Sequence, residues 1–219
     1  MMYLIKGGDE MEAKENIINR YEKLAEEEDN LSCGGKNIIL ADLKEGENVL
    51  DLGCGRGNDI LNAAKIIGER GIAVGLDLTE KMIEEAEKNR KKLNIKNAEF
   101  VVGDVENIPL QDEKFDVVIS DCVINHAKDK EKVYKEIYRV LKTGGKFIVS
   151  DVVSKDRLPD EIVNDPEAWA DCFGGAIPEE EYIKAINNAG FKDIEYLKRR
   201  EYMKNGYPVA SITIKGIKR

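Results

Sequence analysis

One segment of the chain, VLDLGCGRGND, constrains the fold more than any other. A short apolar run ends in Asp51 and is followed by Gly53, Gly55 and Gly57 before a helical pattern begins. Glycines at such a junction let the chain turn tightly and bring its backbone close to a ligand at the N-terminus of the helix. A tight strand-to-helix turn that binds nothing has the same glycines, so the loop alone is weak evidence of binding. Its position between an apolar run and a helix predicts a unit of a parallel α/β sheet.

The rest of the chain repeats this alternation of short apolar runs and longer helical patterns. It predicts an α/β fold with a single doubly wound, Rossmann-like sheet of seven strands, mostly parallel with an antiparallel edge hairpin. The predicted strands are 48–52, 72–76, 98–102, 115–119, 146–152, 194–198 and 211–214. The predicted helices are 9–28, 58–69, 79–93, 130–141, 160–170 and 179–189, the fourth of them stopped by Thr143, Gly144 and Gly145.

The composition limits the class of partner. The 219 residues are 42% hydrophobic, which suits one domain, and the formal net charge of -9 argues against a protein that binds nucleic acid through its phosphates. No run reaches the roughly 18 apolar residues that a membrane span needs. Four cysteines without a CxxC motif or regular spacing do not form a disulfide framework. We therefore expect a cytoplasmic protein with free thiols that binds neither nucleic acid nor a membrane.

Acidic residues follow the next two predicted strands. Asp77 lies about 20 residues beyond the glycine loop, where a carboxylate accepts hydrogen bonds from ribose hydroxyls. Asp104 and Val105 follow the third strand, where a carboxylate and an N–H can read an adenine edge. The alternative for Asp77 is a cap of the following helix, although Thr79 already suits that role. The three positions together predict a nucleoside-containing cofactor at the carboxyl edge of the sheet.

These motifs, taken together, resemble the class I S-adenosylmethionine-dependent methyltransferases, whose first motif ends in a similar D-x-G-x-G-x-G run. A Rossmann dehydrogenase is the competing interpretation, but its loop is G-x-G-x-x-G. The resemblance covers 48–152 and implies S-adenosylmethionine as cofactor. It implies that the glycines hold the amino acid part of the cofactor, that Asp77 holds the ribose and that Met82 packs on adenine. Plain core packing of Met82 stays open. The implied cofactor residues are Asp51, Gly53, Gly55, Gly57, Asp77, Leu78, Met82, Asp104 and Val105.

Cysteines mark three segments outside these motifs: LSCGG, SDCVINHAKDK and AWADCFGGAIP. The last two resemble the arsenite methyltransferases, which carry one cysteine before V-I-N and another before G-G-A. The match continues through YRVLKTGGKFIVSDV and LPDEI, and in that family a further cysteine precedes the first motif, as Cys33 does here. The resemblance implies that Cys33, Cys122 and Cys172 are the catalytic residues. They would bind trivalent arsenic as a substrate, supplied as arsenite or its glutathione conjugate, and an external thiol would release the product.

This chemistry agrees with the residues present. Arsenic(III) is a soft centre that favours thiolates, and three sulfurs leave it one lone pair to aim at the sulfonium methyl group. No general base is needed at the attacking atom, which suits a chain whose one histidine is His126. We expect an N-terminal amphipathic helix and cysteine loop over 1–35 and a methyltransferase domain over 36–219, with a substrate lid at about 154–178.

Two other functions stay open. A methyltransferase that acts on a small organic acceptor would use His126 or Asp121 as its base, and a non-catalytic metalloid–thiol binding protein would keep the cofactor fold without turnover. A cysteine taken alone is more often a buried packing residue than a ligand, and Cys54, inside the glycine loop, is assigned to packing. Trp169 is open to two roles, a roof over the substrate or a core anchor.

Overall fold

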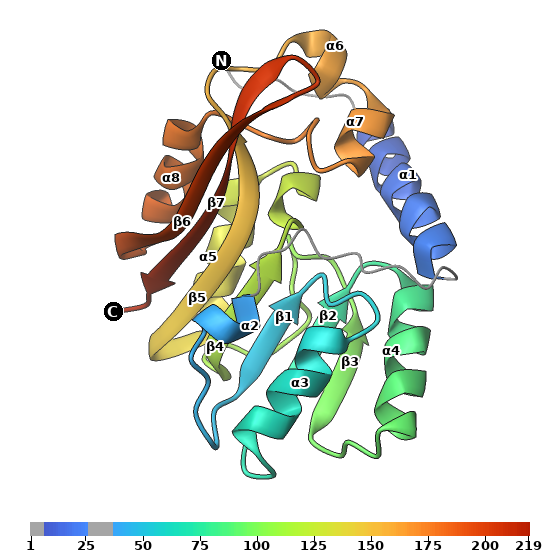
Figure 1. The fold of residues 1–219 in the computed structure, drawn as a ribbon, viewed down its shortest axis with the longest axis vertical. Coiled ribbons are helices and arrows are strands. Elements are labelled where there is room, and N and C mark those ends of the chain that lie inside the picture. Colours follow the sequence, from blue (N-terminus) through green and yellow to red (C-terminus); the bar gives the residue numbers. More distant parts are fainter. Residues whose placement is uncertain (1–6, 26–36) are drawn as a thin grey trace.

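A seven-stranded sheet forms the centre of the computed structural model, which describes residues 7–25 and 37–219 (Figure 1). Its strands lie in the order β3-β2-β1-β4-β5-β7-β6. The first five are parallel, and β7 runs antiparallel to both β5 and β6. This confirms the predicted α/β sheet with its antiparallel edge pair. The strands are β1 (Val49–Leu52), β2 (Ala73–Asp77), β3 (Ala98–Val102), β4 (Phe115–Asp121), β5 (Leu141–Ser154), β6 (Lys192–Lys204) and β7 (Tyr207–Ile217).

Helices cover both faces of this sheet. α3 (Asn58–Ile67) and α4 (Glu80–Lys92) pack on β1 to β3, whereas α5 (Lys130–Val140) and α8 (Glu179–Asn188) pack together beside β5 (Figure 1). α1 (Gly7–Ala25) lies beside α7 (Pro166–Ala170) and also contacts α4. The short elements are α2 (Asn37–Leu40), the 3-10 turn η1 (Ile124–His126) and α6 (Asp160–Val163). Within the described ranges, every helix is too short or too polar to cross a membrane.

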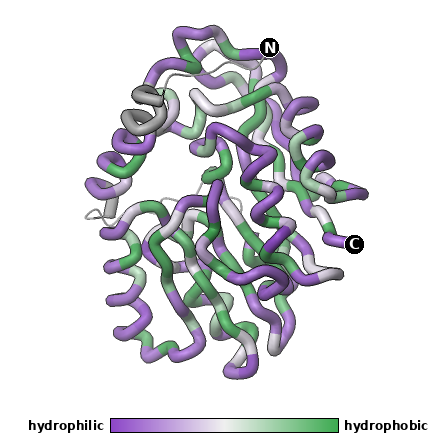
Figure 2. Tube along the Cα trace, turned by 180° about the vertical axis from the view of Figure 1, so that it is seen from behind, coloured by the Kyte–Doolittle hydropathy of each residue, from purple (hydrophilic) through white to green (hydrophobic). Residues whose placement is uncertain are grey.

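The core forms two layers because alternate residues of a strand point to opposite faces. Leu50 and Leu52 of β1 join the cluster under α5 and α8, whereas Val49 joins the cluster under α3. All four residues of β1 are buried, as expected for a central parallel strand with helices on both sides. Figure 2 shows hydrophobic stretches along the strands and alternating character along the helices.

Two local predictions were wrong. The helix predicted over 160–170 is two short helices, because Asp165 accepts a hydrogen bond from the Glu167 N–H and caps a new helix that has proline in its first turn. Residues Thr143 to Gly145 do not stop a helix but lie inside β5, which begins at Leu141 directly after α5. The β4–β5 register shifts there, and Gly144 adopts a φ of 84° that favours glycine.

Candidate active site

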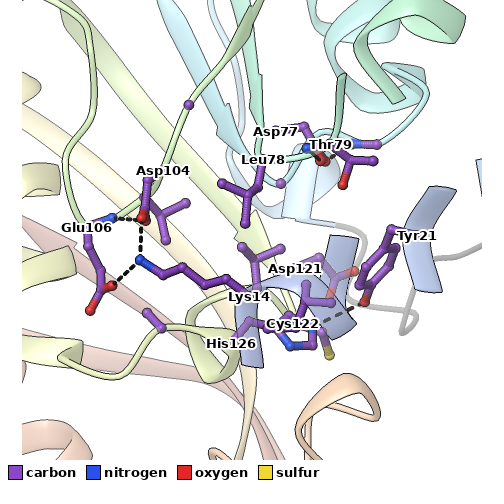
Figure 3. Close-up of a pocket in the computed structure, with 17 residues that line it drawn as sticks. Lys14, Tyr21, Asp77, Leu78, Thr79, Asp104, Glu106, Asp121, Cys122 and His126 are labelled. Carbon is purple, nitrogen blue, oxygen red and sulfur yellow. Dashed lines mark hydrogen bonds and ion pairs between the residues drawn. The ribbon is translucent and has the colours of Figure 1, made fainter. Parts of the chain in front are cut away.

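A cavity of about 130 Å³ lies at the carboxyl ends of the parallel strands, lined on one side by α1 (Figure 3). Six of the nine predicted cofactor residues line it: Gly53, Gly55, Asp77, Leu78, Asp104 and Val105. Its other lining residues are Lys14, Ile17, Tyr21, Thr79, Gly103, Glu106, Asp121, Cys122, Val123, His126 and Ala127. The strand order reverses between β1 and β4, which is where open α/β sheets bind their ligands.

The glycine loop after β1 is shaped by its lack of side chains. Gly53 has a φ of 73°, and a Cβ there would lie 2.1 Å from Cγ2 of Val123. Gly55 has a φ of 50°, and a Cβ there would meet no atom within 4 Å. The absent side chain of Gly53 therefore admits Val123, whereas Gly55 leaves open space beside the cavity. Gly57 contributes no lining atom, and its absent side chain makes room for Phe100.

Asp77, at the end of β2, is fixed by the two loops beside it. Its carboxylate accepts hydrogen bonds from the N–H of Gly55 and from the N–H of Thr79, both at 2.9 Å. Burial raises the pKa of Asp77, and these backbone hydrogen bonds oppose that rise. Thr79 occupies the cap position of α4, but its side chain makes no capping hydrogen bond. Asp77 is thus held at the cavity wall with its carboxylate oriented by the glycine loop.

A lysine of α1 reaches across the cavity to the carboxylates after β3. Lys14 Nζ lies 2.7 Å from Oδ2 of Asp104 and 3.4 Å from Oε2 of Glu106 (Figure 3). Burial lowers the pKa of Lys14, but the hydrogen bond to Asp104 and the charges of both carboxylates outweigh it, so the pKa is raised. The carboxylate predicted to read an adenine edge is therefore engaged by α1 in this structure.

Two predicted cofactor residues lie in the protein interior instead of the cavity wall. Asp51, in β1, is buried, and burial raises the pKa of its carboxyl group well above the ordinary value, with smaller contributions from Asp59, Asp121 and Asp77. Met82 is fully buried in α4 and contributes no lining atom. Contact of either side chain with a cofactor stays a prediction.

Cys122 and Cys172 lie together although 50 residues separate them in the chain. The Cys172 Sγ donates a hydrogen bond to the carbonyl oxygen of Cys122 at 3.1 Å, and both side chains are buried. Both backbones are left-handed, with φ values of 58° and 56°. Such a conformation costs a residue with a Cβ about 1 to 2 kcal/mol, and strain of this kind concentrates at functional sites. Cys33, the third predicted ligand, lies outside the described residues.

His126, the last residue of η1, contacts both the thiol site and α1. Its Nε2 lies 3.1 Å from the Cys172 Sγ and 3.2 Å from the Tyr21 hydroxyl. The neighbouring Asn125 is fully buried and donates hydrogen bonds to the carbonyl oxygens of Val152 and Cys172, at 2.7 and 3.2 Å. These bonds tie η1 to β5 and to the loop after α7, which fixes the two cysteine loops relative to each other.

The chain is similar to known methyltransferases in both sequence and structure. Residues 43–200 match a family model described as a methyltransferase domain. The arsenite methyltransferase of Halobacterium salinarum is 38% identical over 171 residues, 78% of this chain and 44% of that protein. The human arsenite methyltransferase is 34% identical over 187 residues, 81% of this chain and 48% of that protein. A crystal structure of an arsenic(III) S-adenosylmethionine methyltransferase from Chlamydomonas reinhardtii matches with a TM-score of 0.75 and 31% identity, covering 96% of this chain and 73% of that one.

The chain belongs to the arsenite methyltransferase family. That family is part of the class I S-adenosylmethionine-dependent methyltransferases, and this chain spans about half the length of the curated relatives that it matches. S-adenosylmethionine is the cofactor of the family. The groups that line the cavity are of the types that this cofactor needs, because an open glycine turn at Gly55 is combined with carboxylates at Asp77 and Asp104.

Sequence reasoning missed the part of the site that α1 supplies. The apolar spacing that predicted the helix 9–28 gave no sign that its residues Lys14 and Tyr21 would line the cavity. A local pattern shows which face of a helix is buried and not which element buries it.

Two other residues singled out in the sequence pack inside the protein. Cys54 lies in the core cluster under α3, and burial raises the pKa of its thiol well above the ordinary value. Trp169 is buried in α7, where its Nε1 donates a hydrogen bond to the Val163 carbonyl at 2.5 Å and Lys130 Nζ lies 5.3 Å from its ring centroid. Trp169 thus acts as an anchor between α7 and its neighbours.

Proposed function

We propose that this chain transfers the methyl group of S-adenosylmethionine to trivalent arsenic held by cysteine thiolates. The observation that carries the proposal is the meeting of Cys122 and Cys172, whose 3.1 Å contact joins two loops at the cofactor cavity. Cys122 lines that cavity, and both cysteines line a second cavity beside it. A metalloid bound there would lie between the cofactor and the open side of the site.

The residue types suit this substrate. Thiolates are preferred ligands of soft centres, and arsenic(III) bound to sulfur keeps a lone pair for attack on carbon. Bound S-adenosylmethionine supplies the electrophilic methyl group from its sulfonium centre. The task of the protein is then to hold arsenic with its lone pair aimed at that group, which makes orientation the main source of rate enhancement. The two electrons that arsenic gives up to the new bond are returned by an external thiol reductant.

Each lining residue has a proposed task. Gly53 and Gly55 cradle the amino acid part of the cofactor, and Asp77 accepts hydrogen bonds from the ribose. Asp104 and Val105 bind the adenine edge once Lys14 has moved aside. The segment 154–178, which carries Cys172 and contacts α1 through α7, serves as the substrate lid. Cys33 completes the set of arsenic ligands by resemblance to the family.

The test is arsenite methylation by the purified protein with S-adenosylmethionine and glutathione, followed by chromatography with elemental detection of methylated arsenic. Cys122→Ser and Cys172→Ser should each weaken arsenite binding by about 100-fold, because each removes one arm of a chelate. Cys54→Ala is the matched control and should keep arsenite binding. No methylated product together with no arsenite binding by the wild type would refute the proposal. Activity on an organic acceptor that survives both serine variants would favour the alternative methyltransferase instead.

A further inference from the structure

A second cavity, of about 410 Å³, shares Asp121 and Cys122 with the cofactor cavity. Cys172 also lines it, together with residues of strand β6. The cysteines therefore face a separate space in addition to the cofactor cavity. A molecule could therefore bind in the second cavity and contact a metalloid on Cys172 while the cofactor stays in the first cavity.

Basic side chains of β6 project toward this second cavity. Lys198, Arg200 and Lys204 occupy alternate positions of the strand, so they share one face of the sheet. In the strand register, Lys198 lies opposite Thr213 and Arg200 lies opposite Ser211, both on β7. Basic groups and hydroxyl groups thus form one polar wall that runs from β6 toward the cysteines.

The wall keeps a net positive charge when the ion pairs of its charged residues are taken into account. Asp171 is ion-paired with Arg20, and its backbone carbonyl accepts a hydrogen bond from Lys204 Nζ at 2.7 Å. Arg199, which also lines the cavity, pairs with Glu179 and Glu201, and the acidic residues of the lining are Asp121 and Asp171. Lys198 and Arg200 are exposed, and the part of the chain that the structure describes offers neither of them an ion pair. In a protein of net charge -9, this local excess of positive charge favours an anion.

Neither reactant of the proposed reaction needs such a wall. Arsenous acid is uncharged at neutral pH, and the carboxylate of the cofactor lies at the glycine loop in the proposed binding mode. A thiol that also carries carboxylates matches both features of the second cavity. Its sulfur can bind arsenic at Cys172, and its carboxylates can bind the Arg200 guanidinium and the Lys198 ammonium. We propose that the second cavity binds a carboxylate-bearing thiol, which exchanges with Cys172 at arsenic.

The exchange is balanced without an oxidant or a reductant. The bond between arsenic and the Cys172 sulfur breaks, a bond between arsenic and the incoming sulfur forms, and the thiol proton passes to the Cys172 sulfur. Run in reverse, the same step loads arsenic from a thiol conjugate onto Cys172. This exchange rests on the proposed function, whereas anion binding by the wall does not.

The binding test therefore uses a probe that cannot react. S-methylglutathione, which keeps both carboxylates but has no thiol, is titrated calorimetrically into the wild type and into Lys198→Gln/Arg200→Gln. The Kd should rise at least about tenfold in the double variant, since two charge-assisted contacts are lost. Two double variants serve as controls, and the Kd of each should stay within about threefold of the wild-type value. Lys184→Gln/Lys192→Gln removes two exposed charges outside the cavity, and Lys198→Arg/Arg200→Lys keeps the charges of the wall.

Three outcomes would overturn the proposal: no binding of S-methylglutathione by the wild type, an equal Kd in the double variant, or equal binding of the probe with both carboxylates esterified. In arsenite methylation, the half-saturating concentration of glutathione relative to that of 2-mercaptoethanol should also rise in the double variant. Absence of both methylated arsenic and arsenite binding would refute the proposed function and leave the anion-binding result standing, because the calorimetry needs no turnover.

Discussion

The Cys172 Sγ and the Tyr21 hydroxyl lie 3.1 Å and 3.2 Å from the same nitrogen, Nε2 of His126. A neutral imidazole nitrogen has one proton or one lone pair, so it serves only one of these partners well at a time. When the Cys172 proton is transferred to a neutral Nε2, an imidazolium stands beside a thiolate, the form of cysteine that binds soft centres. His126 and Tyr21 line the cavity at the carboxyl ends of the strands, and the other charged or titratable groups that line it are Lys14, Asp77, Asp104, Glu106, Asp121 and Cys122.

Replacement of His126 by leucine should slow the reaction of Cys172 with iodoacetamide at pH 7 by about tenfold, because the thiolate loses its partner. Tyr21→Phe is the matched variant, because it removes only the competing hydroxyl. Its Cys172 should react with iodoacetamide at the wild-type rate or faster. Peptide mass spectrometry after timed alkylation reports each cysteine separately. An unchanged rate in His126→Leu would show that the contact does not activate Cys172.

Replacement of Gly53 by alanine should destabilise the protein by about 2 to 4 kcal/mol, since a left-handed backbone is combined with a clash. The added Cβ would lie 2.1 Å from Cγ2 of Val123. Gly206→Ala is the control for strain alone, because Gly206 has a φ of 84° and open space around the Cβ position. It should cost only about 1 kcal/mol in urea denaturation. Equal costs in the two variants would contradict the clash.

Asp51→Asn should raise the free energy of unfolding at pH 7. Burial raises the pKa of Asp51 in the folded state, so the folded protein favours the protonated carboxyl, and stability is lost as pH rises through that pKa. The advantage of the asparagine variant should therefore shrink as pH falls toward the ordinary value of 3.8. Thermal or urea unfolding between pH 8 and pH 4 measures this difference.

Asp42→Asn is the control for that pH dependence. The hydrogen bond and charge of Lys44 lower the pKa of Asp42, which is exposed, so its contribution has the opposite sign. The variant should gain no stability at pH 7, and any loss should disappear on acidification. If both variants respond to pH alike, burial is not the cause of the Asp51 effect.

Lys14→Met should strengthen the binding of S-adenosylmethionine by a few-fold. Lys14 occupies the carboxylate of Asp104, and a half-buried ion pair of this kind contributes about 1 kcal/mol that adenine would have to displace. Lys23→Met, on the same helix but outside the cavity lining, should change the affinity little. Weaker binding in Lys14→Met would mean instead that the lysine helps to hold the cofactor.

The sequence was sufficient where a local pattern determines position in space. Asp77 and Asp104 could be predicted at the site because the carboxyl ends of adjacent parallel strands meet at one edge of the sheet. The extension of β5 past residue 152 could not be predicted, because the pairing of Val153 and Ser154 with β7 depends on residues far along the chain. The same limit hid the packing of α1 over the cavity and the 3.1 Å contact of Cys172 with His126.

Among residues 7–25 and 37–219, strand β6 pairs only with β7, so its other side is an edge of the sheet as far as the structure describes it. A long strand with unsatisfied backbone groups is a template on which a second molecule can add its own strand, and charged side chains discourage that addition. The lysines and arginines of β6 therefore protect the protein from self-association, whatever ligand they bind. Neutralising them for biochemical purposes is best accompanied by sedimentation measurements, because solubility and ligand affinity depend on the same charges.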